Sequence, residues 1–113
     1  MFTIFQEEAL YWQSYFGLSE WKIYFIYKNL KDRYADILMR WESMSVSIRL
    51  NKAWTGKEEI EVRRCAFHEI SHLLVVELQS YSYHRDVEEQ VHKIIRILEN
   101  SIFKEHLVMR GLV

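Results

Sequence analysis

The stretch RRCAFHEISHLLVVE, residues 63–77, decides the fold of this 113-residue chain. Its second half is apolar almost all round, which predicts a helix buried inside the domain rather than one lying on the surface. Two histidines in it, His68 and His72, stand four residues apart, and Glu69 follows the first. We therefore expect a buried helix from about 57 to 78 that carries three polar side chains in an apolar setting.

The segments around this helix show shorter patterns of their own. Thr55, with Glu58 three residues later, predicts a capping box at the start of the helix. Val46, Ile48 and Leu50 alternate with polar residues, as in a strand with one buried face. The other expected elements are a helix over 3–16, strands over 21–27 and 36–42, a hairpin joining 36–42 to 45–50, and a last helix from about 86 to 105. This order of one helix, three strands and two helices predicts an α+β fold.

The composition restricts the kind of protein. A length of 113 residues predicts one domain over 1–113, and a hydrophobic fraction of 50% is enough for a core. A net charge of -1 predicts no general attraction to nucleic acid or to an anionic membrane, although a local patch stays open. A single cysteine, Cys65, excludes an intrachain disulfide, and we see no secretion signal or apolar span. We expect a cytoplasmic protein.

The spacing of the two histidines suits a metal ion. Residues i and i+4 of a helix project from one face, so His68 and His72 can hold one ion, while Glu69 can reach a water on that ion. Zinc lowers the pKa of a bound water from about 15.7 toward 7, and a nearby carboxylate can then take its proton. Burying these three side chains without a metal would be costly. We predict one Zn²⁺ per chain, with Glu69 as general base.

A catalytic zinc needs a third protein ligand, and the last helix or the loop before it offers several. The apolar stripe of that helix comprises Val87, Val91, Ile94, Ile95, Leu98 and Ile102. If the stripe points inward, Glu88 lies at its edge, Glu89 lies almost opposite, and His92 turns toward solvent. We predict Glu88 as the third ligand. Glu89 replaces it if the helix phase is wrong by one residue, and His84 and His92 are further alternatives.

The loop between the last two helices carries groups that can stabilise a negative charge. A phenol, an imidazolium or a guanidinium there could reach the oxyanion of a tetrahedral intermediate. The candidates are Tyr83, His84 and Arg85, for which ordinary loop packing is the competing interpretation. Cys65 lies on the same helical face as His68, and we expect it to be a small core residue rather than a metal ligand.

The HEISH motif, preceded by SVSIRLN and followed by DVEEQVHKIIRILE, resembles that of small zincin metallopeptidases. It looks most like short metallopeptidases of phages and prophages, and more distantly like the SprT-like and ImmA/IrrE-like groups and the minimal gluzincins. The resemblance implies a zincin-like fold in which His68, His72 and Glu88 bind zinc and Glu69 is catalytic. It also implies a substrate-binding edge strand formed by Ser45, Val46, Ser47, Ile48 and Arg49.

These patterns favour a zinc metallopeptidase that cleaves a peptide or protein substrate. The alternative is a catalytically silent zincin-fold module that binds or regulates a partner and keeps a structural metal. We expect no nucleic-acid partner and no membrane. A third possibility is a peptidase that forms a homo-oligomer. In it the tail FKEHLVMRGLV, residues 103–113, occupies the cleft of a neighbouring chain, and His106 binds that chain's metal.

Overall fold

The computed structural model describes residues 1–54, 57–81 and 87–113, without the side chains of residues 77–81, 87, 88 and 90. Its elements are α1 (Phe2–Tyr15), β1 (Lys22–Lys28), β2 (Ala35–Arg40), β3 (Ser45–Asn51), α2 (Glu59–Tyr81), α3 (Val87–Leu98), the π-helical turn η1 (Glu99–Phe103) and α4 (Lys104–Met109). The α+β order expected from the sequence is confirmed. Helix α2 begins two residues later and ends three residues later than expected, and the predicted cap residue Thr55 lies outside the described residues.

The three strands form one sheet in the order β1-β3-β2. Strands β2 and β3 are the expected antiparallel hairpin, whereas β1 runs parallel to β3. Strand β3 is therefore hydrogen-bonded along both edges. The prediction that Ser45, Val46, Ser47, Ile48 and Arg49 form a substrate-accepting edge is wrong, because a central strand has no free backbone groups for another strand. Among the described strands, β1 and β2 form the edges.

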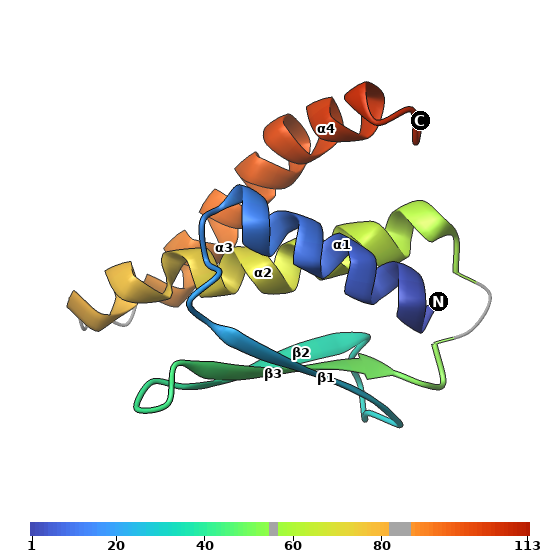
Figure 1. Cartoon of the computed structure of the whole chain (residues 1–113). Coiled ribbons are helices and arrows are strands. Elements are labelled where there is room, and N and C mark those ends of the chain that lie inside the picture. The colour runs from blue at the N-terminus through green and yellow to red at the C-terminus, as the bar shows by residue number, and fades with distance from the viewer. Residues whose placement is uncertain (55–56, 82–86) are drawn as a thin grey trace.

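All the helices lie on one face of the sheet (Figure 1). Val46, Ile48 and Leu50 of β3 point into this layer and are almost fully buried. Helices α1 and α2 pack against each other above them. The ring of Trp12 lies 4.7 Å from that of Phe67, centroid to centroid, in an edge-to-face contact. The core thus fixes α2, and with it the HEISH motif, above the sheet.

The last part of the chain folds back on α1. Helix α3 continues through η1 into α4, so the expected single helix over 86–105 contains a π-helical turn. The hydroxyl of Tyr11 lies 2.6 Å from Nδ1 of His106, which is buried. The tail at 103–113 therefore packs on its own chain here, and its placement in a neighbour's cleft stays a prediction. No helix of the described residues is long and apolar enough to cross a membrane.

A buried ionic cluster joins α1, α2 and the end of α4. The side chain of Glu8 is fully buried and accepts hydrogen bonds from Arg63 at 2.7 Å, from Arg110 at 2.9 Å and from Trp12 Nε1 at 2.6 Å. Burial alone would raise the pKa of Glu8, but the hydrogen bonds from Arg110 and Arg63 outweigh it and hold the pKa below its ordinary value. The cluster ties the C-terminal segment to the helix that carries the HEISH motif.

Candidate metal centre

His68 and His72 lie on one face of α2, as their spacing predicts. Their Nε2 atoms are 3.2 Å apart and their ring centroids 4.9 Å apart. With zinc–nitrogen bonds of about 2.0–2.1 Å in a tetrahedral site, two ligand nitrogens stand roughly 3.3 Å apart. The two imidazoles therefore already converge at the separation that one zinc ion requires.

A third histidine, His92 of α3, completes a cluster with these two. Its ring centroid lies 4.8 Å from that of His72 and 5.7 Å from that of His68. One nitrogen from each of the three rings lies within 4.8 Å of the others. Three histidines could thus hold a metal ion in this structure.

The helix phase that we expected for α3 placed His92 away from α2, and the structure shows why that phase was inaccurate. Val91 and Ile95 are buried and pack with Val75 of α2, whereas Ile94, which we counted in the inward stripe, is 41% exposed. The buried face is narrower than the apolar stripe in the sequence. This rotation leaves His92 exposed on one side but brings its ring to His72.

The other sequence-based candidates are tested less directly. Glu88 belongs to α3, one turn before His92 on the same face, but its side chain lies outside the described residues, so its role as third ligand stays a prediction. Glu89 is exposed. The predicted oxyanion groups Tyr83, His84 and Arg85 all lie outside the described residues.

Sequence reasoning missed Glu99, the first residue of η1. Its Oε1 lies 2.9 Å from Nδ1 of His68, which leaves Nε2 of the same ring for a metal. This hydrogen bond raises the pKa of His68, against burial, which lowers it. Carboxylates that hold the second nitrogen of a histidine ligand fix its orientation. In the sequence, Glu99 follows His92 by seven residues, or two helical turns. This spacing places the two residues on one helical face, and it could have indicated Glu99 as a member of the site.

Electrostatics at His72 suit metal binding. Burial, and then the neighbouring His68 and His92, lower the pKa of His72 to about 4. The ring is therefore neutral at pH 7, and a metal binds only the neutral imidazole. Three clustered imidazoles repel one another when protonated, and a bound metal ion would replace that repulsion with attraction.

Glu69 is the buried carboxylate beside the cluster. It is only 7% exposed, and burial raises its pKa to about 7, helped by the charge of Asp36 and opposed by those of His68 and Arg33. Such a pKa suits a group that must both accept and release a proton near neutral pH. The side chain that the motif predicts as general base therefore lies in an environment fit for that task.

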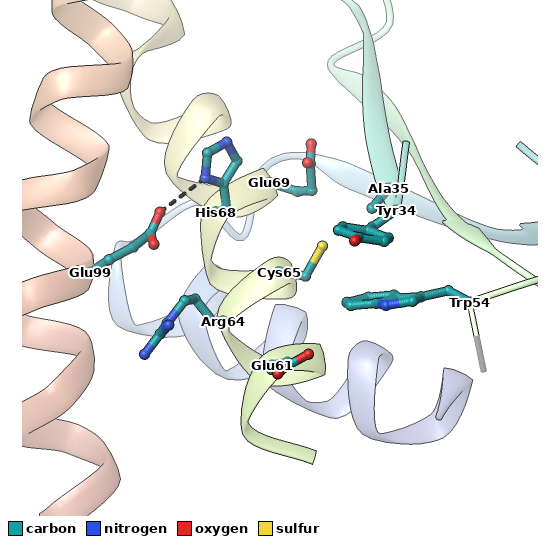
Figure 2. Close-up of a pocket in the computed structure, with 9 residues that line it drawn as sticks. All are labelled: Tyr34, Ala35, Trp54, Glu61, Arg64, Cys65, His68, Glu69 and Glu99. Carbon is teal, nitrogen blue, oxygen red and sulfur yellow. Dashed lines mark hydrogen bonds and ion pairs between the residues drawn. The ribbon is translucent and has the colours of Figure 1, made fainter. Parts of the chain in front are cut away.

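Beside His68 and Glu69 opens a pocket of about 340 Å³ (Figure 2). One wall is aromatic, since the rings of Tyr34 and Trp54 stack with centroids 4.5 Å apart. Glu61, Arg64 and Glu99 supply charged groups to its lining. Cys65 also lines it and is only partly buried, so it is less enclosed than we expected. Burial, with Glu69 and Glu99, raises the pKa of Cys65 to about 12, so its thiol stays protonated at neutral pH.

No protein-family model and no curated protein sequence matches the chain. Among solved structures, the chain is similar to the crystal structure of the metallopeptidase zymogen jannalysin of Methanocaldococcus jannaschii. The two share 19% sequence identity at a TM-score of 0.49, over 83% of this chain and 89% of that one. At that level we draw no conclusion about activity from the match.

Proposed function

We propose that the chain is a zinc-dependent metallopeptidase whose metal is held by His68, His72 and a third ligand from α3. The observation that carries this proposal is the convergence of histidine nitrogens beside a buried glutamate of raised pKa. A structural role alone would not require three imidazoles from two helices to converge with their ring nitrogens facing one another.

The third ligand comes from one face of α3. His92 is the candidate whose side chain already reaches the cluster, and Glu88 lies one turn before it. A catalytic site uses three protein ligands and keeps a fourth position open. Only one of the two residues would therefore bind in an active enzyme, whereas both together would give a closed, structural site.

Each group of the chain then has a distinct task. A bound zinc would supply positive charge and a lowered pKa for an attacking water. Glu69 accepts the proton of that water and later donates it to the leaving amine. Glu99 holds the ring of His68 through Nδ1 and so orients its metal-binding nitrogen.

The substrate would be a peptide or protein segment in extended form. Strand β2 takes the substrate-binding role that the resemblance implied for β3, because it is an edge of the sheet and packs against α2. Its first residue, Ala35, lines the pocket beside Glu69. A peptide paired along β2 could place one side chain against the aromatic wall of Tyr34 and Trp54.

Metal analysis of ligand variants tests the site. Chain purified without chelator should contain about one zinc, measured by mass spectrometry of the metal, and His68→Ala or His72→Ala should contain almost none. Comparing His92→Ala with Glu88→Ala identifies the third ligand. His106→Ala is the matched control, because His106 binds Tyr11 rather than the cluster, and zinc-free but folded wild type would refute the proposal.

The silent module stays the second candidate. If His92→Ala and Glu88→Ala each lower zinc affinity, both residues bind and the site is closed, as in structural zinc sites. A Glu69→Gln variant with unchanged biological activity would point the same way.

A further inference from the structure

The outer face of the sheet is not covered by any described element (Figure 1). Three large apolar side chains lie on it: Tyr24 is 45% exposed, Ile26 is 37% exposed and Leu38 is 61% exposed. The opposite faces of the same strands pack into the core under α1 and α2. This face is therefore a broad surface of apolar and polar groups without a partner among the described residues.

The strand register arranges this face in rows. Tyr24 pairs with Ser47, and Ser47 pairs with Leu38 on the other side. The next row along the sheet joins Lys22 and Arg40 through another serine, Ser45. The two serines between these side chains are short and buried, because the guanidinium of Arg40 lies over them.

The charge of this face differs in sign from that of the whole chain. It carries Lys22, Lys28, Arg40 and Arg49, against one acidic residue, Asp36. Asp36 forms an ion pair with Arg49. Among the described residues, no acidic side chain forms an ion pair with the other three cations. The surface therefore carries a positive excess in a chain whose net charge is -1.

Aromatic and cationic groups adjoin on this surface. Lys22 Nζ lies 5.3 Å from the centroid of the Tyr24 ring, and Cζ of Arg40 lies 6.0 Å from it. Arg40 lies across β3, where it donates hydrogen bonds to Ser45 at 3.1 Å and to Ser47 at 2.8 Å. An exposed ring with two cations near it offers a base a stacking surface and offers its phosphates a counter-charge.

We propose that the outer face of the sheet binds single-stranded nucleic acid, with a base stacked on Tyr24 and phosphates on Lys22, Lys28 and Arg40. A flat sheet face cannot enter a duplex groove, but it can receive unstacked bases. The positive excess favours a ligand that carries phosphates. The exposed apolar side chains of Tyr24 and Leu38 favour a ligand that also carries bases over an acidic polypeptide. This site is separate from the metal centre, which lies on the helical side of the sheet, and it does not depend on the metal.

Fluorescence anisotropy with labelled dT₁₂ and U₁₂ tests this proposal on the full chain. We expect saturable binding at 50 mM salt, and three phosphate contacts at about 0.7 each give a slope of log K against log [salt] of roughly -2. Tyr24→Ala should weaken binding at least about fivefold, and Tyr24→Phe should keep it. Lys22→Glu combined with Arg40→Glu should abolish it.

Lys104→Glu, an exposed charge reversal on α4, is the matched control and should bind like wild type. Circular dichroism and urea denaturation confirm that each variant folds. Absence of binding at 50 mM salt would overturn the proposal, as would equal affinity for Tyr24→Ala and wild type. Equal affinity for polyglutamate would also overturn it, because charge alone would then explain the binding.

Discussion

Helix α2 carries two polar clusters, a buried one around Arg63 and a partly exposed one around His68 and His72, that lie about one and a half turns apart and differ in how their charges are satisfied. Around Arg63, the carboxylate of Glu8 meets two guanidinium groups, so opposite charges face each other. Around His68 and His72, like imidazoles face one another beside a carboxylate of raised pKa. The charges of the first arrangement are satisfied as it stands, while the second arrangement could hold a metal ion. The contrast distinguishes an ion-paired part of α2 from the part that carries the candidate metal centre.

The largest effect on stability should come from disrupting the buried ionic cluster around Glu8. Glu8→Gln removes the buried counter-charge of Arg110 and leaves Arg63 with Glu59 alone, and it should lower the free energy of unfolding by about 3–5 kcal/mol. Urea denaturation measures this loss. Glu7→Gln, one residue away but exposed, is the control and should change little. A loss below about 1 kcal/mol in Glu8→Gln would show that the cluster is not structural.

Removing a histidine of the cluster should abolish metal binding but should not lower the stability of the metal-free chain. His72→Ala should lose the metal, yet in metal-free protein its free energy of unfolding should stay within about 1 kcal/mol of wild type or exceed it. The reason is that the deleted ring is forced to stay neutral by burial and by His68 and His92. Paired urea titrations with and without zinc measure both effects, and a large loss of stability in the metal-free variant would remove the contrast.

Acid should destabilise the buried ionic cluster of Glu8, Arg63 and Arg110 by protonating Glu8. Its pKa is below the ordinary value of 4.5 in the folded chain, so the unfolded chain takes up the proton more readily. The stability that Glu8 contributes is complete above pH 4.5 and is lost as the pH falls through the lowered pKa. Thermal denaturation between pH 7 and pH 3 should show this decline in wild type, and Glu8→Gln should show a shallower one. Identical pH profiles would refute the assignment.

A smaller and more local effect is expected at Glu99. Glu99→Gln removes the carboxylate that holds Nδ1 of His68 and should lower zinc affinity by about 10–100-fold. Competition with a chromogenic chelator measures the affinity. Glu105→Gln, an exposed glutamate of α4, is the control, and unchanged affinity in Glu99→Gln would mean that the contact does not orient the ligand.

The sequence predicts the elements of this fold well because each depends on local patterns. The alternation in 45–50 and the apolar run after His68 predict a strand and a buried helix, and both are present. The sheet order could not be predicted, since the parallel pairing of β1 with β3 depends on contacts between distant segments. The edge position of 45–49 was taken from the resemblance to zincins, and the pairing of β1 with β3 leaves β1 and β2 at the edges instead.

The candidate metal centre was predictable only where its residues belong to one helix. The i, i+4 spacing brings His68 and His72 together whatever the rest of the chain does. His92 reaches them from α3 and Glu99 from η1, and their positions depend on how this helical segment is rotated. The apolar stripe of α3 includes Ile94 and so misleads about the rotation, because in the structure Ile94 faces out while Val91 and Ile95 are buried.

One measurement tests the central claim most directly: peptide cleavage and zinc content, determined together on wild type and Glu69→Gln. We predict about one zinc in both and a cleavage rate at least about 100-fold lower in the variant, because only the proton transfer is removed. Wild type that binds zinc but cleaves no peptide, or a variant that cleaves as fast as wild type, would contradict a metallopeptidase with Glu69 as its base.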